Sequence, residues 1–379
     1  MNIAKNTCYL EFLSYCLDDL LPLPESSSNI NWMRMMDWAE KQAIVGVIYG
    51  GIQNAGKALN IPFDDLMEWI GYAQDIGNHN GLVNKQCLEI VSTFQKDGFK
   101  SCILKGQGNS LMYPNPQLRN PGDIDLLVWG HTDGSLRSKS EQKSDSKLIK
   151  ETIRYVRKKN PRAKACYHHV EYGEFNGVDV EVHYRPSFMN NLIKNRRLQR
   201  FLMSEGECKM DEVELPDGAG RIPVPSWEFN VVFQLSHIYH HVIQSGLKLK
   251  QMVDYYYLLK SNTNRTDSMN ISKMLRHLGL MEIAGAVMWV LKEVLGLEEQ
   301  YLIAPVDERR GRFLLDEIME GGNFGMELKP DAGWLSADTA IGRNVLRLKR
   351  DARLLRYFPS ECLWKPIFRL WHFGWRMAH

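Results

Sequence analysis

The stretch Gly122-Asp123-Ile124-Asp125-Leu126-Leu127-Val128 places two carboxylates, one residue apart, in an otherwise apolar segment. Side chains of a β-strand alternate between its two faces, so Asp123 and Asp125 point to one side and Ile124 to the other. Two neighbouring carboxylates repel each other, and burying them without a partner is costly. A divalent cation removes that conflict, and Mg²⁺ typically binds one or two protein carboxylates together with water and substrate phosphate. The stretch therefore predicts a strand that carries a metal site.

The composition is that of an ordinary globular protein. The chain has 379 residues, of which 44% are hydrophobic and 24% charged, and a net charge of +2. A charge this small creates no global field that favours nucleic acid or a membrane. The seven cysteines form no CxxC pair, which argues against a disulfide framework or a zinc knuckle.

The first residues have the pattern of an amphipathic helix rather than a signal peptide. Nowhere does an apolar run approach the ~20 residues that span a bilayer. We therefore expect a cytoplasmic protein without a membrane partner, and the sequence indicates no obligate protein partner.

The spacing of apolar residues divides the chain into three parts. Residues 1–95 have helical spacing, residues 96–190 contain the strand signals, and residues 191–379 return to helical spacing. This order predicts an α+β protein with an N-terminal helical segment, a small mixed β-sheet core and a larger C-terminal helical domain. Continuous helical patterns cover residues 30–53 and 270–296, and a Pro/Gly-rich excursion covers residues 215–225.

A β-hairpin is expected after the acidic strand. Asn176-Gly177 is a strong signal for a two-residue hairpin turn, and it separates β-like runs at residues 166–175 and 178–184. Alternation along the first run predicts that His168 and His169 point to opposite faces, so that both cannot face one site.

The second run of this hairpin is itself acidic. Asp179 and Glu181 share one of its faces with His183. If this strand pairs beside the first acidic strand, either carboxylate could join Asp123 and Asp125 around metal ions. Two bridged metal ions can bind a triphosphate, activate an attacking oxygen and stabilise the leaving one.

A glycine-containing turn precedes the acidic strand. Lys105, Gly106 and Gly108 lie where a short strand at residues 99–104 runs into a helix, and glycines there allow backbone N–H groups to approach phosphates. Arg119 could bind phosphate oxygens with its planar guanidinium group. Lys105 is alternatively a solvated charge at a strand end, and Arg119 an ion-pair partner of Asp123.

These motifs together resemble a known family. The resemblance rests on Leu104-Lys105-Gly106, Tyr113-Pro114, Arg119, Gly122 to Val128, and Val180-Glu181-Val182-His183. The family comprises bacterial nucleotidyltransferases of the DNA polymerase β-like superfamily, and the similar regions cover about residues 104–128, 167–186 and 226–259. The resemblance implies metal-dependent transfer of a nucleoside monophosphate from a nucleoside triphosphate to an acceptor, with release of pyrophosphate.

Site residues follow from the resemblance position by position. Asp123, Asp125 and Glu181 would be the catalytic residues and would hold two Mg²⁺ ions, with Mn²⁺ as a substitute. The family pattern favours Glu181 over Asp179 as the third acid.

The nucleotide phosphates would be bound at the glycine turn by Gly106 and Gly108, and Lys105 and Arg119 would offset their charge. The glycine motif departs from the family, because Lys105-Gly106-Gln107-Gly108 replaces the usual Gly-Ser or Gly-Gly pair. This departure leaves the phosphate contact open.

The resemblance also implies a nucleotide contact from the C-terminal helical domain. Lys250 and Asp254 are spaced i, i+4 and therefore share one face of a helix. They could bind the nucleotide, or they could simply pair with each other.

Two other functions fit the Asp-x-Asp motif. A glycosyltransferase binds the diphosphate of a nucleotide sugar through such a motif and a metal, and a non-catalytic protein could retain nucleotide binding alone. For the transferase, the acceptor could be RNA, a protein or a small molecule. Eight Lys/Arg residues between Lys147 and Lys164, and nine between Gly342 and His379, slightly favour a phosphate-rich acceptor such as RNA.

Overall fold

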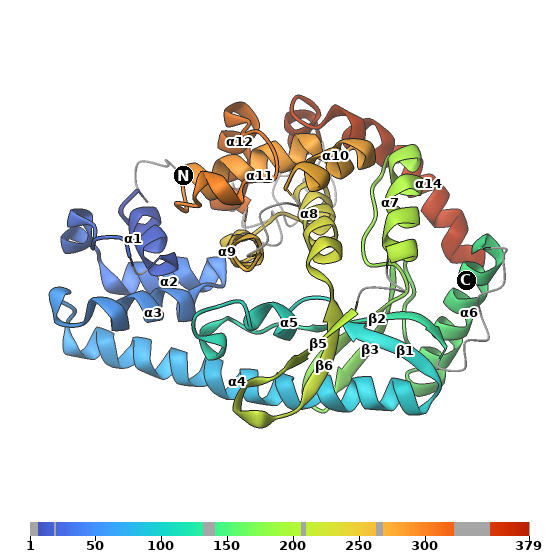
Figure 1. The fold of residues 1–379 in the computed structure, drawn as a ribbon, viewed down its shortest axis with the longest axis horizontal. Coiled ribbons are helices and arrows are strands. Elements are labelled where there is room, and N and C mark those ends of the chain that lie inside the picture. Colours follow the sequence, from blue (N-terminus) through green and yellow to red (C-terminus); the bar gives the residue numbers. More distant parts are fainter. Residues whose placement is uncertain are drawn as a thin grey trace, which may run out of the picture. The chain divides into compact units, whose positions relative to one another are not determined.

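The computed structural model describes residues 7–18, 20–131, 141–205, 210–262, 268–321 and 349–378. They form two compact units, each assembled from separate stretches of the chain (Figure 1). We call the unit of Tyr72–Phe188, Arg196–Phe233 and Arg369–His379 the sheet unit, because it contains the described strands. The helical unit comprises Met1–Gly71, Met189–Asn195 and Gln234–Phe368. The predicted α+β class is confirmed, whereas the division at residues 95 and 190 stays a prediction about domains.

The sheet unit is organised around a mixed four-stranded sheet. Its strands are β1 (Phe99–Ile103), β2 (Ile124–His131), β3 (His169–Phe175) and β4 (Val178–His183), arranged in the order β1-β2-β4-β3. Strand β2 runs parallel to β4, and the two outer pairs are antiparallel. The predicted hairpin around Asn176-Gly177 is therefore confirmed, and its second strand lies beside the acidic strand β2.

One face of this sheet forms the hydrophobic core. Helices α4 (Phe63–Lys96) and α6 (Glu141–Lys159) contribute apolar side chains to the same core cluster as the strands. The strand residues in this cluster occupy alternate positions and include Ile124, Leu126 and Val128 of β2 and Val178, Val180 and Val182 of β4. Because side chains alternate along a strand, the acidic residues between them point to the opposite face.

A second, two-stranded sheet was not expected from the sequence. Strands β5 (Met210–Glu214) and β6 (Arg221–Pro225) pair antiparallel. Strand β6 lies within the Pro/Gly-rich excursion expected at residues 215–225, and β5 immediately precedes it. Pro223 and Pro225 obscure the strand pattern because proline has no backbone N–H to donate. A two-stranded ribbon tolerates proline, because the strands' outer edges need no hydrogen bonds within the sheet.

The sheet unit also contains one short helix and parts of three helices that are divided between the two units. Helix α5 (Gln107–Ser110) is a single turn after β1, and helices α7 (Leu192–Glu205) and α8 (Trp227–Gln244) contain residues of both units. The C-terminal helix α14 (Pro359–Ala378) also contains residues of both.

The helical unit is built from amphipathic and buried helices. They are α1 (Thr7–Leu17), α2 (Trp32–Gln42), α3 (Val45–Ala55), α9 (Leu249–Lys260), α10 (Ser268–Leu278), α11 (Met281–Glu293) and α12 (Glu308–Gly321). Helix α9 is almost entirely buried, which explains why its apolar residues occur on all sides.

Two patterns that predicted continuous helices are interrupted in the structure. Helices α2 and α3 are separated at Ala43, whose φ is +54°, and α10 and α11 are separated at Gly279, whose φ is +78°. In both places a residue with a left-handed backbone conformation ends one helix. The next helix then continues the spacing of apolar residues. Periodicity alone therefore could not reveal either break.

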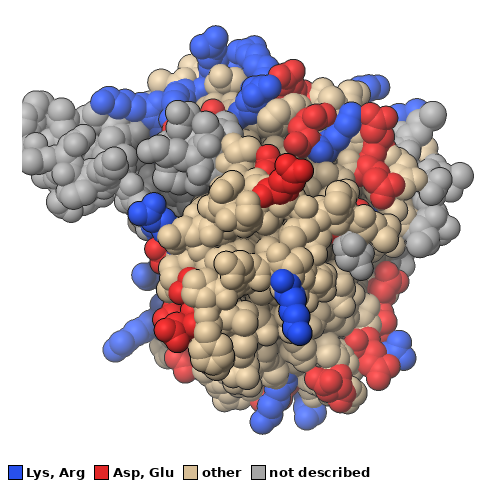
Figure 2. Space-filling view, turned by 90° about the vertical axis from the view of Figure 1, so that its left-hand side faces the viewer, with Lys and Arg blue, Asp and Glu red and all other residues tan. Residues whose placement is uncertain are grey.

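The surface charge, the described helices and the cysteines fit the ordinary globular composition of the chain. Figure 2 shows one face of the molecule, where Lys and Arg lie scattered among Asp and Glu and neither sign covers the face. The helices in the described part of the chain are too short or too polar to cross a membrane. The six cysteines that the structure describes are free thiols.

Candidate metal and nucleotide site

Three carboxylates converge where the parallel strands β2 and β4 lie side by side. Asp123 immediately precedes β2 and is exposed, Asp125 lies within β2 and is 2% exposed, and Glu181 lies in β4. Asp125 is in register with Glu181, and one oxygen atom of each of the three residues lies within 4.8 Å of the others. The parallel pairing thus brings together carboxylates that are far apart in the sequence.

Asp179, the other candidate for the third acid, lies elsewhere on β4. It is exposed and in register with Glu174 of β3. Among the described residues, the acidic group that could hold an ion contains Glu181 and not Asp179. Glu181 thus lies beside Asp123 and Asp125, and its role as the third acid stays a prediction.

Asp125 lies between two cationic side chains. Lys105 Nζ is 2.9 Å from Asp125 Oδ2, and His183 Nε2 is 2.9 Å from Asp125 Oδ1. His183 is 2% exposed, and its Nε2 also lies 3.4 Å from Glu181 Oε2. Lys105 is consequently an ion-paired residue of the site rather than a solvated charge at a strand end.

The charges at this site stabilise one another. Burial alone would raise the pKa of Asp125, but Lys105 and then His183 lower it overall. Burial alone would lower the pKa of Lys105, but Asp125 and Asp123 raise it overall. Each shift favours the charged form of the group, so Asp125 and Lys105 remain ionised near neutral pH.

The surroundings of His183 favour its positively charged form. Burial alone would lower its pKa, but hydrogen bonds to Asp125 and Glu181 raise it to about 9. The geometry agrees, because Nδ1 lies 3.3 Å from the carbonyl oxygen of Arg185 and Nε2 faces the carboxylates. Both ring nitrogens therefore face acceptors, as expected of an imidazolium.

His183 and His169 were not predicted as site residues. His169 Nδ1 lies 3.2 Å from Glu181 Oε2, and burial first of all lowers its pKa to about 4. For His183 the signal was present in the sequence, since it follows Glu181 by two residues on the same strand face. For His169 the signal was the pairing of β3 with β4, which places it opposite His183.

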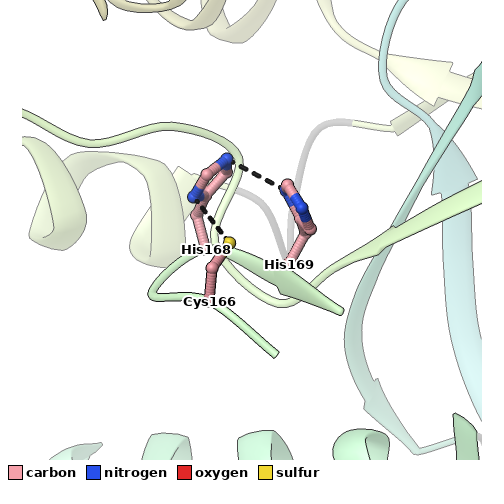
Figure 3. A group of neighbouring side chains, drawn as sticks. All are labelled: Cys166, His168 and His169. Atoms are coloured by element: carbon pink, nitrogen blue, oxygen red, sulfur yellow. Dashed lines mark hydrogen bonds between the residues drawn. The ribbon is translucent and has the colours of Figure 1, made fainter. Parts of the chain in front are cut away.

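The prediction that His168 and His169 cannot face one site is wrong. Their imidazole rings lie together, with His168 Nε2 3.0 Å from His169 Nδ1 (Figure 3). Strand β3 begins at His169, so His168 belongs to the preceding bend. Alternation between faces applies only within a strand and therefore does not separate these two residues.

The glycine turn has a backbone that requires glycine. Gly106 has a φ of +69°, which residues with a Cβ rarely adopt. A Cβ on Gly108 would lie 2.8 Å from Val224 Cγ1, so this position is restricted by the packing of β6. Backbone conformation thus explains glycine at position 106, and packing explains it at position 108. Phosphate binding at the turn stays a prediction.

The remaining predicted nucleotide contacts are not tested by this geometry. Arg119 is 3% exposed and its Nη1 donates to the carbonyl oxygen of Asn120 at 3.5 Å. Lys250 and Asp254 lie in α9 of the helical unit, where Asp254 is 6% exposed. Their roles toward a nucleotide stay predictions.

Comparisons with known proteins agree with the chemistry of the acidic group. A family model described as an uncharacterised nucleotidyltransferase matches residues 28–296. The chain belongs to this family, which indicates nucleotidyl transfer from a nucleoside triphosphate as its general activity.

Among solved structures, the chain is similar to an antigenic nucleotidyltransferase-like protein from Paracoccidioides brasiliensis. The sequence identity is 10%, the TM-score is 0.31, and the match covers 63% of this chain and 97% of that one. Among curated proteins, none matches the sequence.

Proposed function

We propose that this protein is a metal-dependent nucleotidyltransferase of the DNA polymerase β-like superfamily that acts in the bacterial cytoplasm. It transfers a nucleoside monophosphate from a nucleoside triphosphate to an acceptor and releases pyrophosphate. The observation that carries this proposal is the convergence of Asp123, Asp125 and Glu181 within 4.8 Å on adjacent parallel strands.

The donor set fits hard divalent cations. Carboxylate oxygens suit Mg²⁺ and Mn²⁺, which also bind water and phosphate. Asp123 is exposed and the side chain of Glu181 is 34% exposed, so substrate can approach, while Asp125 forms the buried side. Asp123, Asp125 and Glu181 would hold two ions, which when bound would offset phosphate charge and activate the acceptor oxygen.

The chain's own groups then have distinct tasks in the transfer. An acceptor hydroxyl oxygen attacks the α-phosphorus, the bond from this phosphorus to the pyrophosphate oxygen breaks, and the hydroxyl proton must leave. Glu181 is suited to take that proton. Burial alone would raise its pKa, but a hydrogen bond from His183 lowers it overall, so Glu181 is ionised and can accept a proton.

Charge and orientation at the triphosphate come from neighbouring residues. Lys105, held at Asp125, supplies positive charge for the β- and γ-phosphates. The turn from Gly106 to Gly108 offers backbone N–H groups, and Arg119, Lys250 and Asp254 complete the predicted nucleotide contacts. Positioning and charge of this kind account for most catalysis of phosphoryl-type transfer.

The acceptor remains to be identified among RNA, proteins and small molecules. Several basic residues of the segments that favoured RNA are engaged within the protein. Lys159 Nζ lies 3.7 Å from Asp97 Oδ2, Lys365 Nζ lies 2.7 Å from Asp351 Oδ1, and Arg350 pairs with Glu317. These pairs reduce the charge available to RNA, so a screen should include all three classes of acceptor.

A labelling screen tests the function and the acceptor together. The protein is incubated with each of four α-labelled nucleoside triphosphates, Mg²⁺ and a cell extract. We expect one class of molecule to become labelled, and we expect labelling to fall by about 10³-fold in Asp123→Asn, because several kcal/mol of charge stabilisation are lost. Asp179→Asn, on strand β4, which also carries Glu181, is the matched control, and it should retain wild-type labelling.

Three results would contradict the proposal. Undiminished labelling by Asp123→Asn would remove the acidic group from catalysis. Binding of nucleotides without transfer to any of the acceptors would indicate a non-catalytic nucleotide-binding protein. Release of UDP or GDP from nucleotide sugars would indicate a glycosyltransferase.

A further inference from the structure

A second group of ligand atoms lies beside the acidic site and is chemically different from it. Cys166 Sγ lies 3.4 Å from His168 Nδ1, and His168 Nε2 lies 3.0 Å from His169 Nδ1 (Figure 3). One ligand atom from each of these three residues lies within 4.8 Å of the others. All three side chains are half-buried, so an ion could reach them and be partly enclosed.

The backbone brings these side chains together in a tight reverse turn. Ala165 and Val170 form an antiparallel bridge, and the N–H of Cys166 donates to the carbonyl oxygen of His169 at 2.9 Å. Residues 167–168 therefore form the tip of the turn. Cys166 and His169 are directly opposite each other across it, at a separation where cross-strand side chains meet.

The turn is held from outside by the two residues that follow β4. Tyr184 Oη donates to the carbonyl oxygens of Cys166 and His169. The backbone N–H groups of Tyr184 and Arg185 both donate to the carbonyl oxygen of His168, and Arg185 Nη1 donates to that of Tyr167 at 2.7 Å. All four carbonyl groups of the turn are thus engaged, which pre-organises the side chains that it carries.

A thiol and two imidazoles are the donors that Zn²⁺ prefers. Zinc–sulfur bonds of about 2.3 Å and zinc–nitrogen bonds of about 2.0–2.1 Å place tetrahedral ligand atoms roughly 3.3–3.6 Å apart. The two observed contacts involve different nitrogens of His168, of which only one can bind a given ion. Because one ligand atom of each residue lies within 4.8 Å of the others, rotation of the rings would bring the three ligand atoms to this spacing. Three protein ligands also leave a fourth position for water, as in zinc sites that remain open.

We propose that Cys166, His168 and His169 form a binding site for a Zn²⁺-type ion, separate from the hard-oxygen site of Asp123, Asp125 and Glu181. Glu181 links the two sites, because its Oε2 lies 3.2 Å from His169 Nδ1. The proposal goes beyond nucleotidyl transfer and does not depend on it.

Cobalt substitution tests this site in the full chain. The chelator-treated protein is titrated with Co²⁺, whose bond to a thiolate gives a charge-transfer band that carboxylate and imidazole ligands do not produce. We expect one equivalent to bind with this band and Zn²⁺ to displace it. Cys166→Ser should remove the band and weaken Zn²⁺ binding by at least about 100-fold, more than the loss of an outer-shell partner.

Control variants separate this site from the rest of the chain. Cys8→Ser replaces another half-buried cysteine and should leave the band unchanged. Asp123→Asn should also leave it unchanged, so failure of the transferase proposal and failure of this one give different results. His168→Gln, at the tip of the turn, provides a second ligand variant if circular dichroism shows that Cys166→Ser does not fold.

The zinc proposal would be overturned by a titration without a thiolate band. It would equally be overturned by a band that persists in a folded Cys166→Ser or His168→Gln protein. Binding of Co²⁺ that disappears in Asp123→Asn would assign the ion to the acidic group instead.

Discussion

Asp125 occupies a different environment from Asp123, although only one residue separates them in the sequence. Asp125 is 2% exposed and paired with Lys105 and His183, whereas Asp123 is exposed. Removing one member of a buried group of charges leaves the others uncompensated in a medium that solvates them poorly. Both residues are expected to bind the ion, but they should contribute differently to the free energy of unfolding.

Asp125→Asn should lower the free energy of unfolding by about 3 kcal/mol, because Lys105 and His183 lose their shared counter-charge. Asp123→Asn should change it by no more than about 0.5 kcal/mol, as is usual for an exposed side chain. Urea denaturation of both variants measures the difference. Equal free energies of unfolding for the two variants would show that Asp125 does not compensate the charges of Lys105 and His183.

Glu361, in the first turn of α14, provides a prediction about pH. It is 2% exposed, and its Oε2 accepts a hydrogen bond from the N–H of Asn190 at 2.5 Å. Burial raises its pKa to about 7 from the ordinary value of 4.5. The folded state thus keeps a proton that the unfolded state loses, so this group's contribution to stability is complete below pH 4.5 and lost as pH rises to about 7.

Glu361→Gln should remove this pH dependence because glutamine does not titrate. The free energies of unfolding of wild type and variant should diverge between pH 4.5 and 7, with the variant gaining on the order of 3 kcal/mol. Denaturant titrations at several pH values measure the difference curve. Parallel curves for the two proteins would contradict the buried, protonated state of Glu361.

At the scale of elements, the turn between β1 and α5 is the most constrained part of the candidate site. The N–H groups of Asn109 and Ser110 both donate to the carbonyl oxygen of Gly106, so this single-turn helix depends on the conformation of Gly106. Its φ of +69° is open to glycine at little cost and strained for other residues. The conformation of one residue therefore sets the direction of the whole turn.

Gly106→Ala should destabilise the protein by about 1–3 kcal/mol, the usual cost of a strained backbone conformation. It should also lower nucleotidyl transfer if the turn orients phosphates. Gly130→Ala is a suitable control, because that glycine has no positive φ and a Cβ there meets nothing within 4 Å. Chemical denaturation compares the two, and a loss in both variants alike would contradict a special role for Gly106.

At the scale of the whole molecule, the predicted nucleotide contacts belong to two compact units. The acidic group, the glycine turn and Lys105 lie in the sheet unit, whereas Lys250 and Asp254 lie in the helical unit. Nucleotide binding would then report whether both units take part in the function.

Hydrogen exchange measures this participation directly. Adding Mg²⁺ and a non-hydrolysable nucleoside triphosphate should slow exchange in β2 and β4, because binding raises the cost of local opening. If α9 contacts the nucleotide, exchange should slow in α9 as well and not in α12, which serves as the control. Equal protection of α9 and α12, or none in either, would remove Lys250 and Asp254 from the nucleotide site.

Much of the sheet could be predicted because its signals are local. Alternation identified the buried faces of β2 and β4, and Asn176-Gly177 identified the hairpin. Strands β5 and β6 were missed because Pro223 and Pro225 resemble loop residues when their pairing partner is unknown. The helix breaks at Ala43 and Gly279 were missed because the apolar spacing continues across them.

The sequence by itself determined the α+β class and the strand that carries Asp125 with Asp123 just before it, because these depend on spacing along the chain, and its motifs indicated a nucleotidyltransferase. Only the tertiary structure shows that Glu181, and not Asp179, lies within 4.8 Å of Asp123 and Asp125. It also revealed His183 between the carboxylates of Asp125 and Glu181, and the turn that brings Cys166 to His168 and His169. The physical reason is that strand register and turn geometry arise from pairing between distant segments, which spacing within one segment does not encode.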